Sequence, residues 1–249
     1  MLNSQVGKNL NRKEFVAKAL VAAAGLGVLA GCGGLPGDPI IDDLHTKNVY
    51  PGSDVTYDIG ASGNAYLTAY INNVICGGLW DDLRTPINAI KLGGVNPPTE
   101  ISYRGSLVYV FGDKILAQEQ QVVYFSVQLP HTYMEGSDLI PHVHWVAEDG
   151  TVGNAVWLLT YSWANIDGAF PVEQTITSIG ANHGENAHNV ANFSVIDGTD
   201  KNISSMLLCS LKRNSSNVLD TLNGKNVYLI EIDFHYQVDT FGSINVYPK

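Results

Sequence analysis

The chain has 249 residues, of which 45% are hydrophobic and only 15% are charged. A chain of this length and composition can bury a substantial core, which excludes an intrinsically disordered protein. Its formal net charge is −10. Because an acidic surface repels phosphate backbones, we expect no nucleic-acid partner for the main domain.

The first 32 residues differ from the rest, because they combine a basic flank with an apolar run and a cysteine. Basic residues, among them Arg12 and Lys13, precede the apolar run 19–30, which ends just before Cys32. This order resembles a bacterial lipoprotein signal, and Arg12-Lys13-x-Phe15 is similar to a twin-arginine signal. On this interpretation Cys32 is the lipidated residue. The alternative is a short helical anchor in a larger assembly, where small residues allow neighbouring helices to approach closely.

Residues 33–54 are predicted to form a linker, because Leu35-Pro36-Gly37-Asp38-Pro39 cannot hold a helix. We therefore expect three parts: a helical or signal segment in 1–32, the linker in 33–54, and a β domain in 55–249. Turn residues separate short apolar runs throughout the third part, which is typical of an all-β domain.

Strands are predicted where short apolar runs alternate with polar residues, at 55–59, 65–74, 107–111, 122–129, 142–147, 156–163, 204–211 and 227–238. In the last of these, Ile232, Phe234, Tyr236 and Val238 share one face, while Glu231, Asp233, His235 and Gln237 share the other. The connecting segments lack the long helical apolar spacing that parallel βαβ units require. We therefore predict an all-β, antiparallel jelly-roll sandwich.

Two histidines separated by one residue form a candidate metal site. In a strand, His142 and His144 point to the same face, with imidazoles roughly 7 Å apart, so they could share a divalent metal. With Glu148 four residues later they resemble the first metal-binding motif of the cupins, which are jelly rolls. His188 fits the spacing of the second cupin motif, although no Pro-x-Gly turn precedes it. The alternative is that both histidines hydrogen-bond across a packed interface.

Catalysis is not indicated by any familiar motif. The sequence has no GxSxG, HExxH or Walker-type pattern, and no GxGxxG that opens a helix. We therefore expect no enzyme and no cofactor, apart from the metal of the cupin-like alternative. Cys76 and Cys209 show no CxxC spacing and are expected to be reduced and buried.

Several ordered motifs between residues 79 and 249 resemble uncharacterised structural proteins of tailed-bacteriophage virions. The motifs are Leu79-Trp80-Asp81-Asp82-Leu83-Arg84-Thr85-Pro86, Lys91-Leu92-Gly93-Gly94, Leu129-Pro130-His131, Pro141-His142-Val143-His144-Trp145, Tyr161-Ser162-Trp163-Ala164-Asn165 and Glu231-Ile232-Asp233-Phe234-His235-Tyr236-Gln237-Val238-Asp239-Thr240-x-Gly242-Ser243. The resemblance covers most of the predicted β domain.

The resemblance implies a fibre, spike or head-decoration protein that acts by self-assembly and attachment in the virion. Its partners would be other virion proteins and a host-surface glycan or protein. The resemblance also implies a homotrimer, and the physical properties are compatible with assembly, because oligomers remove sheet edges and partly apolar faces from water. The residues expected at the subunit interface or in packing are His142, His144, Trp145, His235 and Tyr236.

The sequence is also compatible with two other functions. The first is an exported bacterial lipoprotein, anchored to a membrane outside the cytoplasm through Cys32 and binding a surface polymer or partner. The second is a cupin-like metal-binding protein that uses His142 and His144.

Overall fold

The computed structural model describes residues 78–93, 96–113 and 121–247. These lie in the second of two compact units, residues 69–249. The predicted N-terminal segment, the linker, the strands at 55–59 and 65–74, Cys32 and Cys76 lie outside the described residues. Within the described ranges, no helix is long and apolar enough to cross a membrane.

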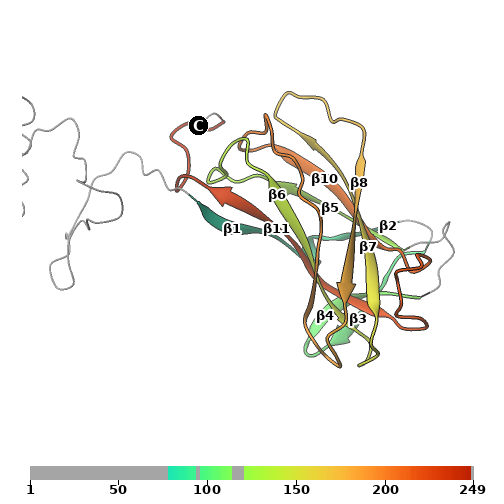
Figure 1. Ribbon diagram of the computed structural model, residues 1–249. Helices are drawn as coiled ribbons and strands as arrows, with labels where there is room; N and C mark the ends of the chain where they lie inside the picture. The colour runs from blue at the N-terminus through green and yellow to red at the C-terminus, as the bar shows by residue number, and fades with distance from the viewer. Residues whose placement is uncertain (1–77, 94–95, 114–120, 248–249) are drawn as a thin grey trace, which may run out of the picture. The chain divides into compact units, whose positions relative to one another are not determined.

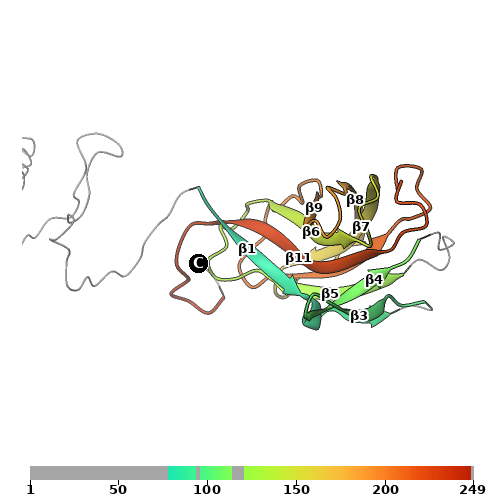
Figure 2. The ribbon, with the colours of Figure 1, turned by 90° about the horizontal axis from the view of Figure 1, so that it is seen from below.

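Two antiparallel sheets make up the described domain (Figures 1 and 2). The first sheet has the order β3-β4-β11-β6-β9, with β1 also paired to β11, and the second has the order β2-β5-β10-β7-β8. The first sheet contains β1 (Leu79–Pro86), β3 (Thr99–Tyr103), β4 (Ser106–Phe111), β6 (Leu139–Ala147), β9 (Asn189–Asn192) and β11 (Val227–Val238). The second contains β2 (Lys91–Gly93), β5 (Val122–Gln128), β7 (Asn154–Ala164), β8 (Gln174–Ala181) and β10 (Met206–Arg213). A short 3₁₀ helix, η1 (Ile87–Ala89), links β1 to β2.

The eight strands from β4 to β11 have jelly-roll connectivity. The chain passes between the sheets at every step except the β7–β8 hairpin, which gives the facing orders β4-β11-β6-β9 and β5-β10-β7-β8. This interleaving is that of an eight-stranded jelly roll, in which each sheet buries its inner face against the other. The predicted fold class is confirmed.

Strand β11 is the central strand of the first sheet. It pairs with β6 on one side, and on the other side first with β4 at Val227–Leu229 and then with β1 from Glu231 onward. A register shift between Leu229 and Glu231 marks a β-bulge at this changeover. The extra residue lets Val227 and Leu229 face the core before the bulge and Ile232 face it after. The acidic and histidine residues of β11 therefore all stay on the outer face.

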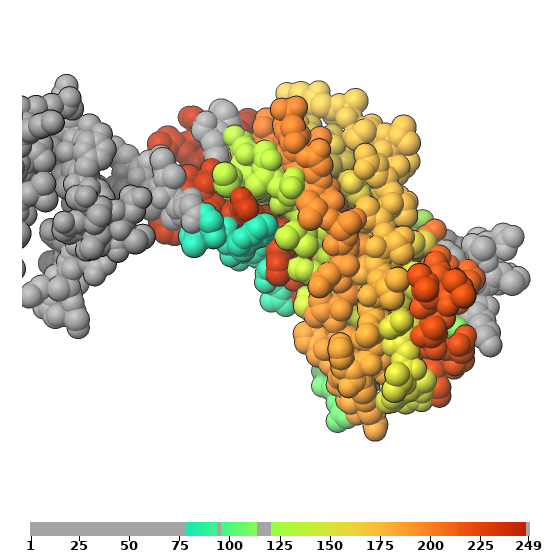
Figure 3. All heavy atoms as spheres, in the orientation of Figure 1, coloured from blue at the N-terminus to red at the C-terminus, as the bar shows by residue number. Residues whose placement is uncertain are grey.

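Aromatic side chains fill the space between the sheets. Phe111 from the first sheet meets Trp157 from the second edge-on, with ring centroids 5.3 Å apart, and Trp145 lies 6.4 Å from Trp157. Both tryptophans are fully buried, and such edge and tilted contacts stabilise a core beyond the area that they bury. At Gly180 a Cβ atom would come within 2.8 Å of the Trp145 indole nitrogen, so β8 can approach this ring only without a side chain. In the space-filling view the segments around β7, β8 and β9, in yellow and orange, lie side by side on the face that is turned to the viewer (Figure 3).

A buried ion pair holds the segment between β10 and β11 against the sandwich. Arg213 donates to both carboxylate oxygens of Asp220, at 2.9 and 2.7 Å, and the two side chains are 1% and 0% exposed. The guanidinium also donates to the backbone oxygens of Leu222 and Lys225, while Asp220 accepts from the Val156 N–H group. Each of the three guanidinium nitrogens of Arg213 therefore donates to an oxygen atom, which offsets the free-energy cost of burying both charges.

Removing one partner of this pair should be strongly destabilising. We expect Asp220→Ala to lower the free energy of unfolding by about 3–5 kcal/mol, because the buried charge of Arg213 would keep only its longer, 4.0 Å contact with Asp113. Urea denaturation measures the loss. Lys225→Ala is the control, since it breaks the solvent-exposed pair of Lys225 with Asp149, keeps the hydrogen bond from the Thr151 N–H group to Asp149, and should leave the unfolding midpoint almost unchanged. Equal losses in both variants would contradict the structural role of the Arg213–Asp220 pair.

Candidate functional site

Ionisable side chains gather on the outer face of three adjacent strands, β1, β11 and β6. In register, Asp82 of β1 lies opposite His235 of β11, and Asp233 of β11 lies opposite both Arg84 of β1 and His142 of β6. Together with His188, which lies just before β9, they form a group that we call the outer-face cluster; its members are Asp82, Arg84, His142, His144, His188, Glu231, Asp233 and His235. It holds four of the seven histidines of the chain, so this face is the chemically distinctive surface of the described domain.

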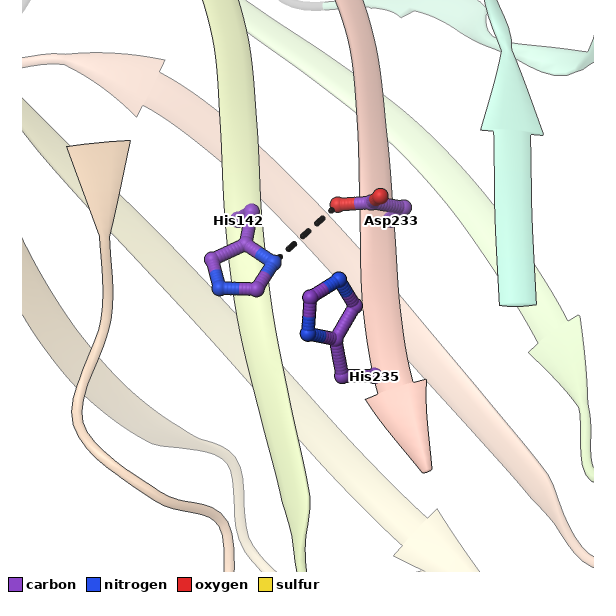
Figure 4. A group of neighbouring side chains, drawn as sticks. All are labelled: His142, Asp233 and His235. Atoms are coloured by element: carbon purple, nitrogen blue, oxygen red, sulfur yellow. Dashed lines mark ion pairs between the residues drawn. The ribbon is translucent and has the colours of Figure 1, made fainter. Parts of the chain in front are cut away.

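Asp233 is the centre of the cluster. Its Oδ1 atom lies 3.5 Å from His142 Nδ1 (Figure 4), and its Oδ2 atom lies 3.3 Å from His144 Nε2. The residue is only 5% exposed. Burial by itself raises the pKa of this carboxyl group, but its interactions with His142 and His144 outweigh burial and hold the pKa well below the usual range. Asp233 is therefore a buried carboxylate anion between two imidazoles.

His144 connects Asp233 to the edge of the sheet. Its Nδ1 atom is 2.8 Å from His188 Nε2, so one ring donates and the other accepts. The hydrogen bond to Asp233 raises the pKa of His144, with partial burial opposing this effect. His188 lies just before β9, which pairs with β6 at His144. A hydrogen-bonded chain thus runs from the carboxylate to solvent.

Further polar contacts tie β1 to the other side of β11. His235 Nε2 lies 2.8 Å from Asp82 Oδ1, and the Arg84 guanidinium donates two hydrogen bonds of 2.6 Å to Glu231. The His142 and His235 rings are in contact, with centroids 4.2 Å apart and a T-shaped arrangement. An open pocket of about 320 Å³ adjoins this network, with Arg84, His144 and Glu231 among the residues that line it. The cluster is therefore open to solvent on one side.

The predicted metal ligands are only partly brought together. The structure places His142, His144 and His188 in the cluster. Glu148 lies beyond the end of β6, where its carboxylate accepts a hydrogen bond from the Asn226 N–H group. The four-ligand set suggested by the cupin resemblance is thus not assembled. Moreover, Val143 and Trp145, which alternate with the two histidines along β6, occupy the core, so both imidazoles face away from the interior of the sandwich.

The residues predicted for an interface or for packing divide into two groups. Trp145 and Tyr236 lie in the core, with 0% and 3% exposure. His142, His144 and His235 lie in the outer-face cluster, where Asp82 and Asp233 provide charge partners. Cys209 is buried with a free thiol, as expected, and burial raises its pKa.

Sequence reasoning did not identify the carboxylates and the arginine as members of the site. The alternation of 227–238 places Asp233 and His235 on one face, and the same rule unites His142 with His144. The sequence does not show that β6 and β11 pair with each other and that β1 pairs with β11, and this pairing brings the carboxylates to the histidines. The polar sequence Trp80-Asp81-Asp82 gave no strand signal, although its alternation places Asp82 and Arg84 on one face.

The comparisons with known proteins give only distant matches. No family model and no curated protein matches the chain. Among solved structures, one match is the CBM22-1–GH10 modules of endo-1,4-β-D-xylanase 10B from Clostridium thermocellum, with 9% identity, 63% of this chain and 28% of that chain covered, and a TM-score of 0.36. Another is the CBM36-1 domain of a multidomain xylanase from the hindgut metagenome of Trinervitermes trinervoides, with 12% identity, coverages of 68% and 100%, and a TM-score of 0.33. TmCBM61 in complex with β-1,4-galactotriose has 11% identity, coverages of 64% and 90%, and a TM-score of 0.28. Similarities this low give no information about what this chain binds.

The carboxylate of Asp233 should control the protonation of His144. Replacing it in Asp233→Asn keeps the shape but removes the charge and the accepting carboxylate, so the pKa of His144 should fall from its raised value. An NMR titration of the imidazole signals measures the change. Asp82→Asn is the control, since Asp82 has the weakest of the resolved influences on His144 and should lower its pKa less. A larger fall in Asp82→Asn than in Asp233→Asn would contradict the central position of Asp233.

Proposed function

We propose that this chain is a structural component of a tailed-bacteriophage virion, a fibre, spike or head-decoration protein that acts by self-assembly and attachment and not by catalysis. One observation carries the proposal. Three of the phage-type motifs are far apart in the sequence, yet they form the adjacent strands β1, β6 and β11. The β6 and β11 motifs contribute apolar residues to the core, Leu83 of the β1 motif packs against it, and all three motifs contribute polar residues to the outer-face cluster. The three motifs that carry the resemblance therefore lie side by side in one sheet.

The second sheet supports self-association. Its five strands contain no Asp or Glu, although the chain has 24 acidic residues. On the outer side of β10, Leu208 is 48% exposed and lies between Ser126 of β5 and Ser162 of β7. Identical subunits of net charge −10 repel one another, and a face without carboxylates reduces that repulsion where copies meet. We therefore place the subunit contacts of the proposed homotrimer on this sheet.

The virion assignment is tested by the location of the chain. In purified phage particles encoded by the same genome, peptide mass spectrometry should detect residues 79–249 at the abundance of a structural protein. Attachment partners would then be other virion proteins and a host-surface glycan or protein. Absence from the particles, together with a lipid-modified Cys32 in the membrane fraction, would contradict the proposal and favour the exported lipoprotein.

A charge placed in the carboxylate-free sheet should prevent self-association. We expect the wild-type chain to sediment as a trimer and Leu208→Glu to sediment as a monomer, because each contact would bury a carboxylate without a partner. Sedimentation velocity measures the change. The control is Leu107→Glu in β4 of the first sheet, which changes a residue of similar exposure (51%) and should remain trimeric. A monomeric wild type, or a trimeric Leu208→Glu, would contradict this subunit contact.

A further inference from the structure

We propose that His142, Asp233 and His235 form a binding site for one divalent transition-metal ion of the Zn²⁺ class. One ligand atom from each residue lies within 4.8 Å of the other two. The residues come from two adjacent strands whose register is fixed: Asp233 lies opposite His142, and His235 lies two residues further along β11. Figure 4 shows the two rings and the carboxylate turned toward one another. The site differs from the cupin-like set in its ligands, since it uses neither His144 nor Glu148.

The spacing fits a single ion after small side-chain rotations. Zinc binds imidazole nitrogen and carboxylate oxygen at about 2.0–2.2 Å, so the ligand atoms of a tetrahedral site lie about 3.4 Å apart. The Asp233 and His142 atoms are already 3.5 Å apart. His235 has the freedom to complete the set, because its side chain is 41% exposed. The backbone of the sheet therefore needs no rearrangement.

The buried oxygen of Asp233 is an independent observation that points to a cation. Asp233 Oδ1 accepts no hydrogen bond, although the atom is fully buried. Its contact with His142 Nδ1 is an ion pair at 3.5 Å, and the Asp233 side chain is only 8% exposed. Leaving a carboxylate oxygen unsatisfied in such a position costs free energy. A metal ion between this oxygen and the two imidazoles would satisfy it. The neighbouring Arg84 is not the cation that does so, since its guanidinium is paired with Glu231.

The surroundings resemble an outer coordination shell. His235 Nε2 contacts the Asp82 carboxylate at 2.8 Å, so His235 would bind the ion through its other ring nitrogen, Nδ1, after a rotation of the ring. The second oxygen of Asp233 contacts His144 at 3.3 Å. Contacts of this kind orient metal ligands and raise their basicity. Two imidazoles and one carboxylate suit zinc and its neighbours among the transition metals better than Mg²⁺ or Ca²⁺, which prefer oxygen ligands. Three protein ligands leave a coordination position open, and it would be filled by water.

The test is a zinc titration of the full chain, purified without a histidine tag and stripped with chelator. Isothermal calorimetry should give one ion per chain at this site. His142→Ala and His235→Ala should each weaken binding by more than the roughly 10- to 100-fold that is typical of an outer-shell substitution, whereas Asp82→Asn should fall within that range. Zinc should also raise the melting temperature of the wild type and not that of His235→Ala, because only a folded chain with all three ligands binds the ion.

The controls separate this site from other zinc-binding groups. His183→Ala changes an exposed histidine outside the cluster and should bind zinc as the wild type does, and circular dichroism verifies that each variant is folded. Wild-type protein that binds no zinc, or a folded His235→Ala that keeps wild-type affinity, would overturn the proposal. Loss of the site in His144→Ala or His188→Ala, with His235→Ala unaffected, would also overturn it by placing the ion at the other histidine pair.

Discussion

The position of β11 in the centre of the first sheet is the constraint on which the rest of the structure depends. Its pairing with β6 fixes Asp233 opposite His142, and its pairing with β1 fixes Asp82 opposite His235. The bulge at residue 230 lies where the outer neighbour changes from β4 to β1, and it keeps the apolar residues of β11 facing the core on both sides of the change. Without that extra residue, the apolar residues before the bulge and those after it would point to opposite faces of the sheet.

The energetics of the core and of the outer face are linked through the same strands. On the inner side, Phe234 and Ile232 are fully buried against the second sheet, and this burial provides the main stabilisation of the fold. That packing fixes the backbone of β11. The side chains of Asp233 and His235, which point to the outer face, are therefore held next to their neighbours on β6 and β1. Asp233 is consequently held next to His142 and His144 even though an isolated buried carboxylate would be unfavourable.

Much of the fold could be predicted from the sequence, because alternation is a local property. The range 227–238 matches β11 at both ends, and the ranges predicted at 107–111, 122–129, 142–147, 156–163 and 204–211 each overlap one observed strand. Strands β1, β2, β3, β8 and β9 escaped prediction because their sequences are polar or short. The site depends on register between strands, which alternation does not encode. The four histidines of the cluster could therefore be named as candidates, while their carboxylate partners could not.

The two outer faces of the sandwich differ in a way that argues for two separate roles. The second sheet lacks acidic residues, and its exposed side chains are mainly hydroxyl-bearing or apolar, so copies of this acidic chain can approach one another there with least repulsion. The first sheet concentrates histidines and carboxylates that would be costly to desolvate in a subunit contact. The same groups in water can exchange protons, bind a cation or contact a partner. If subunits meet through the second sheet, the exposed members of the outer-face cluster, which include Arg84, His188 and His235, stay open to solvent on every copy, as the proposed attachment role would need.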